Sequence, residues 1–372
     1  MTLKKFFGVT GVLVASLGIS GYAFLQLPMF GAISSAERLS KSSNYIDGQF
    51  QNLQPNPEPT LDAGEQKGWI DMLLATTEGK TPPGSVPVVV TDLHSLDRDT
   101  DVVVWLGHSS FFIQLAGKRI LIDPVLSKNA SPVPMTNEAF KGSSPFDAHD
   151  IPDVDYLLIS HDHWDHLDYP TMLALKDRID EVIVGIGVGE HFRAWGFRED
   201  QINEAEWETT FNVDDDLALH VLPARHYSGR GLVKNQSLWV SFALESSNSK
   251  VFFSGDSGYG SHFKAIGERF GGFDLALLDS GQYDEQWRHV HMMPEDAAQA
   301  MEDLNAKVLI PAHIGKFSIA FHSWDDPFKR LMAASRGKDW LLSTPLIGQP
   351  VKIQSPDPAP PARWWETLSG AN

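Results

Sequence analysis

Short apolar runs alternate with amphipathic stretches along most of the chain after Asp101. Runs of this kind, ended by glycine, proline or polar residues, are typical of buried strands, whereas apolar residues at a spacing of three to four predict helices. Helices are expected at residues 168–178 and 294–304, and the second has Pro294 near its start and acidic residues in its first turn, as helix starts favour. The expected strands include residues 102–106, 111–115, 119–122, 181–186, 237–244, 250–254 and 274–278.

This order of strands and helices favours one domain, built as a two-sheet sandwich with helices on its outer faces. Residues 28–60 are polar and rich in Ser, Asn, Gln and Pro, which indicates a tether or an arm that wraps the domain. A short helix is expected within residues 61–80, and the Pro-rich stretch 355–361 is expected to be irregular. The predicted organisation is a segment at 1–27, a tether and N-terminal arm at 28–90, and the main domain at 91–365.

The first 27 residues contain an uncharged stretch, residues 6–27, behind Lys4 and Lys5. As a helix this stretch would span ~33 Å, about the thickness of the hydrocarbon core of a membrane. A cleavable signal peptide has a shorter apolar part of ~7–15 residues, so an uncleaved signal anchor is favoured, with residues 21–23 as the alternative cleavage site. Lysines before the stretch place the start of the chain in the cytoplasm. The sequence thus predicts a membrane-anchored protein whose main domain lies outside the cytoplasm, on the periplasmic side in a bacterium.

The densest group of candidate ligands is the hexapeptide HDHWDH at residues 161–166, directly after an apolar run. In an extended chain His161 and His163 project to the same side, because side chains repeat every second residue. If the chain then turns into a helix, Asp165 and His166 reach a second point in space. The hexapeptide contains no Lys or Arg that would pair with its acids. It therefore predicts ligands for two adjacent metal ions, for which zinc suits this His and Asp mixture best, with iron or manganese as alternatives.

Three further candidate ligands also follow strand-like runs. His226 ends the run 219–226, Asp256 follows 251–254 among glycines, and His313 ends 308–313. One polar residue at the end of a strand is ordinary. Four strand ends that all offer His or Asp favour a shared site, because ligands and catalytic groups collect at strand ends in layered α/β folds.

The order of these motifs resembles that of the metallo-β-lactamase superfamily. Within it, the chain is most similar to the branch of the N-acylphosphatidylethanolamine-hydrolysing phospholipase D and its bacterial relatives. The similarity covers residues 45–365, and its segments are WLGHSS at 105–110, HDHWDHLD at 161–168, PARHYS at 223–228, FSGDSGY at 253–259, HMMPEDA at 291–297 and AHIGKF at 312–317. The resemblance implies an α/β fold, an αββα sandwich with metals at one edge, which here would follow an N-terminal membrane anchor.

By this resemblance, seven residues are metal ligands, three for each of two Zn²⁺ ions and one between them. The first ion would take His161, His163 and His226, the second would take Asp165, His166 and His313, and Asp256 would bridge the two. The residues implied in catalysis are Asp165, Asp256 and His291, the last as a substrate contact or as the proton donor to the leaving group. His108 would lie near the metals as a supporting residue, with a purely structural histidine as the equal alternative. Lys316 and the loop 282–288 depart from the family pattern, which leaves the substrate open.

The implied function is a binuclear metal-dependent hydrolase. The leading interpretation is a phosphodiesterase of phospholipase D type, in which a hydroxide shared by two metal ions attacks the phosphorus of a phospholipid such as N-acylphosphatidylethanolamine. One alternative is hydrolysis of another ester, such as a lactone, a β-lactam or a sugar phosphate. A diiron redox protein of the same fold is a second alternative, although the His-x-His start argues against it. A non-catalytic zinc protein is the third, and the complete ligand set argues against it.

The composition narrows the expected partners. A net charge of −18 argues against nucleic acid, because phosphate backbones are bound by clustered cations. It does not exclude a phosphorylated substrate, because two divalent ions would reverse the local field. The absence of cysteine rules out disulfides and thiolate-ligated zinc. The expected partners are a phospholipid or another small ester, and a membrane bound through the N-terminal helix; the sequence sets no oligomeric state.

Overall fold

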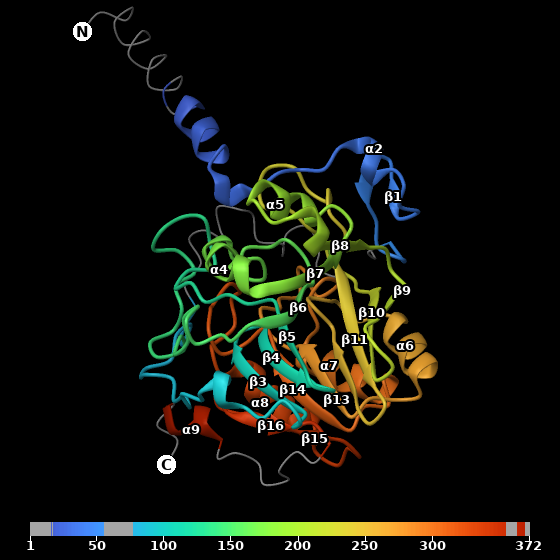
Figure 1. Ribbon diagram of the computed structural model, residues 1–372. Coiled ribbons are helices and arrows are strands. Elements are labelled where there is room, and N and C mark those ends of the chain that lie inside the picture. Colours follow the sequence, from blue (N-terminus) through green and yellow to red (C-terminus); the bar gives the residue numbers. More distant parts are fainter. Residues whose placement is uncertain (1–15, 17, 56–76, 355–362, 369–372) are drawn as a thin grey trace, which may run out of the picture.

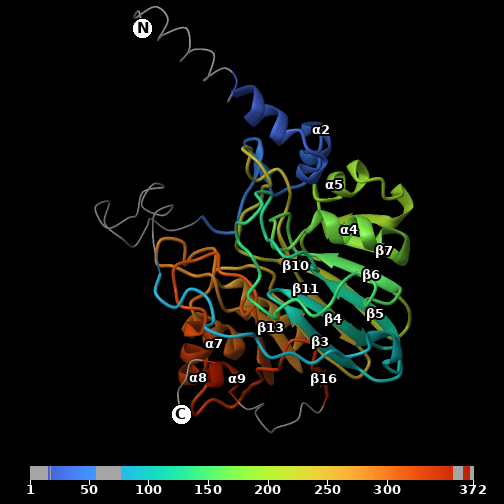
Figure 2. The same cartoon turned by 90° about the vertical axis from the view of Figure 1, so that its left-hand side faces the viewer.

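Two seven-stranded sheets packed face to face form the centre of the molecule, as the computed structural model shows (Figure 1). The structure describes residues 16, 18–55, 77–354 and 363–368. Helices lie on the outer faces of both sheets (Figure 2). The αββα sandwich implied by the resemblance is confirmed.

The first sheet has the strand order β16-β3-β4-β5-β6-β7-β8. Its strands pair antiparallel from β16 to β5 and parallel from β5 to β8. Most positions of its inner strands are buried, and β3 is apolar throughout, as expected for strands covered on both faces. The strands are β3 (Val102–Gly107), β4 (Ser110–Leu115), β5 (Lys118–Ile122), β6 (Val154–Ile159), β7 (Ile179–Gly185), β8 (Ile202–Ala205) and β16 (Pro350–Lys352).

The second sheet has the order β15-β14-β13-β12-β11-β10-β9. It is antiparallel from β9 to β12 and parallel from β12 to β15. Phe111 of β4 and Phe253 of β12 meet between the two sheets, with ring centroids 6.0 Å apart. The strands are β9 (Thr209–Asn212), β10 (Leu217–Pro223), β11 (Val240–Ser246), β12 (Lys250–Phe253), β13 (Leu275–Asp279), β14 (Val308–Ala312) and β15 (Leu341–Leu342).

Helices α6, α7 and α8 cover the outer face of the second sheet, where Phe263, Met301 and Leu331 pack in one apolar cluster with Phe252 and Leu309. Helices α4 and α5 lie on the side of the first sheet (Figure 2). The α-helices are α2 (Ala36–Leu39), α4 (Tyr169–Leu175), α5 (Gly189–Ala194), α6 (His262–Phe270), α7 (Pro294–Asp303), α8 (Asp326–Ala334) and α9 (Trp364–Leu368). Short 3-10 turns lie at η1 (Pro28–Phe30), η2 (Leu93–Ser95), η3 (Lys176–Arg178) and η4 (Glu199–Gln201).

The segment before the sandwich packs against it as an arm over residues 28–55. Leu39 and Phe50 of this arm are fully buried, and its small hairpin consists of β1 (Tyr45–Ile46) and β2 (Gln49–Phe50). Residues 61–76 of the expected helix within 61–80, and the expected irregular tail at 355–361, lie outside the described residues.

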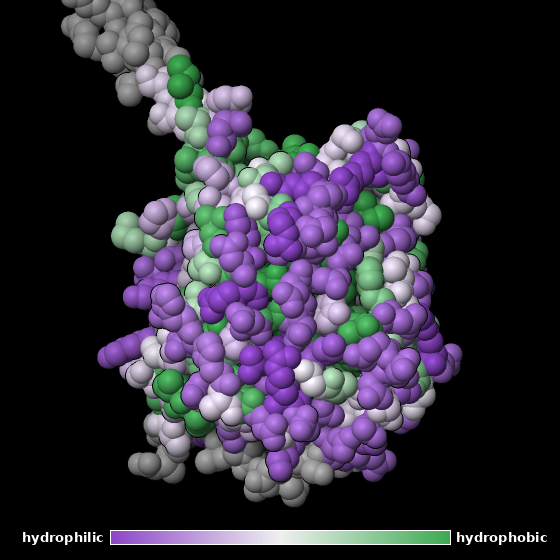
Figure 3. All heavy atoms as spheres, in the orientation of Figure 1, coloured by the Kyte–Doolittle hydropathy of each residue, from purple (hydrophilic) through white to green (hydrophobic). Residues whose placement is uncertain are grey.

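Residues 18–25 are helical and lead away from the domain (Figure 1). Over the described part of the chain, no helix has the length and apolar character that a membrane crossing requires. Most of the expected anchor, residues 1–15 and 17, is not among the described residues, so the anchor stays a prediction. The visible face of the domain is mainly hydrophilic, whereas apolar residues appear along the N-terminal helix (Figure 3).

Candidate metal centre

Strand β6 delivers the hexapeptide to one edge of the sandwich. After His161 the chain makes a tight turn, in which the backbone N–H groups of His166 and Leu167 donate to His163 O at 3.2 and 2.9 Å. This turn places Asp165 beside His166 and His313, whereas His163 lies beside His226. The two places adjoin, because the ring centroids of His161 and His166 are 4.2 Å apart. One loop therefore presents side chains to two neighbouring places.

The remaining predicted ligands come from the ends of three strands in the second sheet. His226 follows β10, Asp256 follows β12, and His313 comes directly after β14 with a positive φ of 64°. His313 also joins the two sheets, because its N–H donates to His108 O at 3.2 Å while the N–H of His108 donates to Ile314 O at 3.1 Å. The structure thus brings all seven predicted ligands to one edge of the sandwich.

The first set consists of His161, His163 and His226, with Asp256 beside them. Nδ1 of His163 lies 2.9 Å from His161 Nε2 and 3.2 Å from His226 Nε2. One ligand atom from each of the four residues lies within 4.8 Å of the others. Three imidazoles and a carboxylate that converge in this way can hold one divalent ion.

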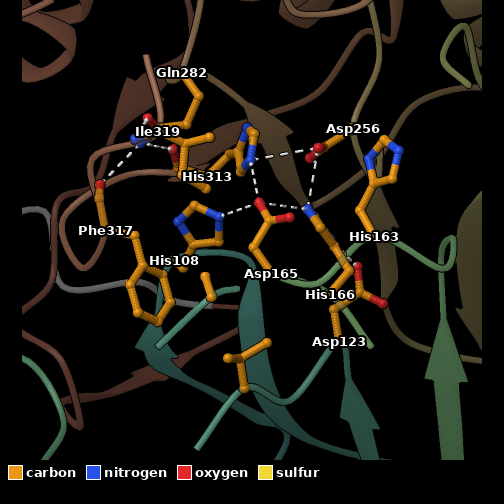
Figure 4. A network of polar contacts seen from close by, with 12 residues as sticks. His108, Asp123, His163, Asp165, His166, Asp256, Gln282, His313, Phe317 and Ile319 are labelled. Atoms are coloured by element: carbon orange, nitrogen blue, oxygen red, sulfur yellow. Dashed lines mark hydrogen bonds and ion pairs between the residues drawn. The ribbon is translucent and has the colours of Figure 1, made fainter. Parts of the chain in front are cut away.

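The second set is centred on Asp165 (Figure 4). Its Oδ2 lies 3.0 Å from His313 Nε2, 3.5 Å from His166 Nε2 and 2.9 Å from His108 Nε2. His108, which lies in the β3–β4 turn with a φ of 55°, therefore contacts the candidate ligands directly. This position would allow the supporting role that the resemblance implied, which stays a prediction.

Asp256 lies between the two sets. Its Oδ2 is 3.1 Å from His166 Nε2 and 3.4 Å from His313 Nε2 on one side. On the other side it is 3.7 Å from both His161 Nε2 and His226 Nε2. A single carboxylate oxygen within reach of imidazoles from both sets is the arrangement expected of a bridging ligand.

The three histidines of the first set are held in the neutral form, which is the form that binds a metal ion. Burial lowers the pKa of His161 and His226 well below the ordinary value, and neighbouring histidines lower the pKa of both further. Burial also lowers the pKa of His163 to about 4, against the opposing pull of the nearby acids. Neutral imidazoles offer free lone pairs, which is the form that binds a metal ion.

Two buried atoms in the centre lack hydrogen-bond partners. These are Asp256 Oδ1 and His166 Nε2, and the latter lies 3.1 Å from Asp256 Oδ2 without forming a hydrogen bond to it. Buried polar atoms are costly unless they are paired, and a divalent ion would satisfy both. The donors are imidazoles and carboxylates without sulfur, which fits zinc and also iron or manganese. The residues present therefore fit the predicted metal pair, while the identity of the metal stays a prediction.

Two further acids, which the sequence analysis missed, contact the Nδ1 atoms of two candidate ligands, His166 and His313. Asp123 accepts from the backbone N–H of Ser160 at 2.7 Å, and its Oδ2 lies 2.7 Å from His166 Nδ1. Asp279 lies behind His313, with 3.3 Å between Oδ1 and Nδ1. Both acids are fully buried, and both lie at the carboxyl ends of strands, β5 and β13. The strand-end signal that pointed to the ligands would also have found them.

His291 precedes α7 and faces the centre. Its Nδ1 lies 2.9 Å from Asp279 Oδ2 and 3.9 Å from Asp256 Oδ2. Asp279 therefore orients both His291 and His313, one with each oxygen. Carboxylates that bind the second nitrogen of a histidine fix its tautomer and ring orientation.

A cavity of ≈ 470 Å³ opens above these residues, lined on its floor by His163, Asp165, Asp256, His291 and His313. Its walls include Trp164, Tyr227, Trp287 and Ile319. Gln282, in the loop that departs from the family pattern, also lines it, with Nε2 donating to Phe317 O at 3.0 Å and Oε1 accepting from the N–H of Ile319 at 2.7 Å.

Comparison with known proteins agrees with this geometry. A family model described as the β-lactamase superfamily domain matches residues 118–314. An N-acyl-phosphatidylethanolamine-hydrolyzing phospholipase D of Caenorhabditis elegans is 30% identical over 79% of this chain and 90% of its own length. An uncharacterised protein of Mycobacterium tuberculosis is 38% identical over 87% of this chain and 88% of its own length. The crystal structure of an isothiocyanate hydrolase from Delia radicum gut bacteria has a TM-score of 0.53 at 16% identity, and covers 68% of this chain and 98% of its own.

The protein has two packed sheets with paired His and Asp clusters at one edge. This arrangement and the comparisons identify a metal-dependent hydrolase. Within that class, the chain belongs to the metallo-β-lactamase superfamily.

Proposed function

We propose that the protein is a binuclear metal-dependent phosphodiesterase of phospholipase D type, which acts on phospholipids such as N-acylphosphatidylethanolamine. The observation that carries the proposal is the position of Asp256 Oδ2 between the two sets of imidazoles, on the floor of the cavity. Support for the substrate comes from the Caenorhabditis elegans relative, whose name states this activity, and which this chain matches over 90% of its length.

Each predicted residue has a role in this proposal. The first set and the second set would hold one ion each, and Asp256 would fix their spacing. Two bound divalent ions would lower the pKa of a water molecule and stabilise charge on the attacked phosphate. Asp165, held by His108 at 2.9 Å, would orient the second ion. His291, held by Asp279, is placed to give a proton to the leaving oxygen, because general acids act within hydrogen-bond reach of the group that they protonate.

The cavity walls suit a substrate with an apolar part. Trp164, Trp287 and Ile319 offer apolar surface next to the polar floor. Such walls would bind acyl chains and keep bulk water from the reacting phosphate, which strengthens every electrostatic interaction there. The cavity volume is within the range of pockets that bind small organic ligands.

The direct test is to incubate the zinc-loaded full chain with a phospholipid extract and to identify the products by mass spectrometry. We expect phosphatidic acid and a released head group, and neither in a chelated sample. A protein that holds two zinc ions and leaves all lipids unchanged would contradict the phospholipase activity. It would favour a small soluble ester as the substrate instead.

Asp256→Ala tests the centre itself. Loss of the carboxylate between the two sets should lower turnover at least ~10²-fold, as removal of a group that stabilises the transition state does. Asp274→Ala is the matched control, because Asp274 directly precedes β13 of the same sheet and pairs with Lys307 at 2.7 Å outside the site. Normal turnover in the Asp256 variant would refute the site.

We further propose that the N-terminal segment holds the enzyme on the membrane that contains its substrate, with the catalytic domain outside the cytoplasm. The support is the uncharged stretch 6–27 behind two lysines. The full chain should stay in the membrane fraction after a high-salt wash. Complete release by salt would contradict an inserted anchor.

A further inference from the structure

Arg230 is a buried arginine that binds both ends of the hexapeptide loop. Its Nη1 donates to Asp162 O at 2.9 Å and to Leu167 O at 2.6 Å. Its guanidinium carbon lies 3.9 Å from the ring centre of Trp164, in the middle of the same loop. Arg230 therefore contacts both ends and the middle of the loop, and restrains its conformation. None of these groups belongs to the predicted ligand set.

The other half of the guanidinium is held by the N-terminal arm. Nε and Nη2 of Arg230 donate to Met29 O at 3.2 and 2.9 Å. Residues 28–33, here named the N-terminal support, are fixed in turn by Trp195, whose Nε1 donates to Pro28 O at 2.8 Å. Phe30 packs edge-on against Trp164, with ring centroids 5.1 Å apart. A segment ~200 residues earlier in the chain thus completes the binding site of the arginine.

A second connection runs from the N-terminal support to the loop through His191. The backbone N–H of Ala32 donates to His191 Nδ1 at 3.2 Å, so the ring proton lies on Nε2, which donates to Asp162 Oδ2 at 3.2 Å. The fit is close, because a Cβ on Gly31 would lie 2.1 Å from His191 Nδ1. Asp162 also accepts from the N–H of Gly229 at 2.6 Å. The carboxylate between the two metal-binding histidines is therefore tied to the same segment.

We propose that Arg230 is a positioning residue for the metal centre, and that the N-terminal support holds Arg230 in place. The inference rests on the proposed metal centre, because four of the seven predicted ligands lie on the hexapeptide loop. Metal ligands bind well only when outer contacts fix their orientation, and loss of such contacts typically costs 10–100-fold in metal affinity. The N-terminal support is thereby a part of the metal centre.

The first test is Arg230→Met, which keeps the length of the side chain and removes the guanidinium. The matched control is Arg178→Met, since half-buried Arg178 also ties two carbonyls, Ile151 O at 2.5 Å and Ala148 O, at a distance from the site. Zinc affinity is measured on the full chain by competition with a chromophoric chelator, together with the melting temperature. We expect both variants to melt earlier, but only the Arg230 variant to bind zinc about 10-fold more weakly. Arg230→Lys should recover part of the affinity.

The second test separates the N-terminal support from the arginine. Gly31→Ala would drive a methyl group into His191 and displace the support. Gly48→Ala is the control, because Gly48 also has a positive φ, of 81°, but a Cβ there would meet nothing within 4 Å. Both variants share the backbone strain, and only Gly31→Ala should weaken zinc binding.

The outcomes distinguish this inference from the proposed function. A wild-type protein that binds no zinc would overturn the metal centre, and the positioning role with it. A wild-type protein that binds two zinc ions with affinities unchanged in the Arg230 and Gly31 variants would overturn the positioning role alone. If Arg230→Met does not fold, Arg230→Lys and Gly31→Ala carry the same comparison.

Discussion

At the scale of single residues, the least expected side chain is Lys316, which is almost completely buried close to the metal centre. Its Nζ donates to Val125 O at 2.7 Å, and burial lowers its pKa to about 8 although Asp168 opposes the shift. Its stem lies against the β3–β4 turn, where a Cβ on Gly107 would be 2.9 Å from Lys316 Cδ. Lys316 thus packs against Gly107, next to His108 in the chain, and is not among the residues that line the cavity.

Lys316→Met should therefore stabilise the protein at neutral pH. Below pH 8 the native protein keeps the buried charge at a cost of about 3 kcal/mol, since the pKa is about 8 in place of 10.5. Loss of the hydrogen bond to Val125 offsets about 1 kcal/mol of the gain. Between pH 8 and 10.5 the native state loses the proton before the unfolded state does, so the stability of the wild type rises towards that of the variant. Urea unfolding at pH 7 and pH 10 measures the gap, and a gap that does not shrink at high pH would contradict this account.

Asp279 contacts two histidines at once, so its removal should weaken metal binding. Asp279→Asn keeps the volume but removes the charge that faces His313 Nδ1 and His291 Nδ1. We expect zinc affinity to fall ~10–100-fold, as for other outer partners of metal-binding histidines. Asp274→Asn, at the other end of β13, is the control and should leave zinc affinity unchanged. Equal affinities in both variants, measured by chelator competition, would show that Asp279 is only structural.

At the scale of elements, apolar runs located the inner strands well. The run expected at 250–254 matches β12, and the helix expected at 294–304 matches α7. The run 237–244 was wrong at its start, because β11 begins at Val240. Trp239 before it is buried in a loop, with Nε1 donating to Asn52 and to Ala224 O. Buried loop residues and strand residues are equally apolar, so sequence alone does not separate them.

The same reasoning explains what was found and missed in the site. The predicted ligands lie at the ends of apolar strands, and the spacing within the hexapeptide indicates that its side chains reach two neighbouring metal positions. The contacts of Arg230 with Met29 depend on segments that meet only in the folded chain. The polar edge strand β8 (Ile202–Ala205) likewise carries no apolar run that would reveal it. The local sequence pattern therefore predicts the metal ligands. The residues that hold those ligands in place can be identified only from the tertiary structure.

The close packing of β7 against the loop before β11 gives a prediction at this scale. A Cβ on Gly185 would lie 2.1 Å from Leu238 O, so Gly185→Ala should destabilise the protein by about 1–3 kcal/mol. Gly231→Ala is the control, because its Cβ would come no closer than 4.0 Å to Phe30. Chemical unfolding of the two variants measures the difference. Equal stabilities would mean that β7 moves away from the loop at little cost.

At the scale of the whole molecule, the metal centre joins the two sheets. The hexapeptide follows β6 and His108 lies between β3 and β4 of the first sheet, whereas His226, Asp256 and His313 follow strands of the second. The backbone bonds between His108 and the segment at His313 and Ile314 cross the same junction. Ligands from both sheets can converge only when the sandwich is closed, so metal binding and folding should be strongly coupled.

Removal of metal should therefore lower the stability of the entire sandwich. A ligand that binds only the native state, at a free concentration 1,000-fold above its Kd, stabilises it by about 4 kcal/mol. Calorimetry of the zinc-loaded and the chelated protein should show one cooperative transition that moves to lower temperature after chelation. Asp256→Ala should reduce this difference, because its Oδ2 lies within 3.7 Å of imidazoles from both sets. A chelated protein in which only part of the structure melts early would show that the two sheets are held together without the metal, and that the centre is a local feature of one edge.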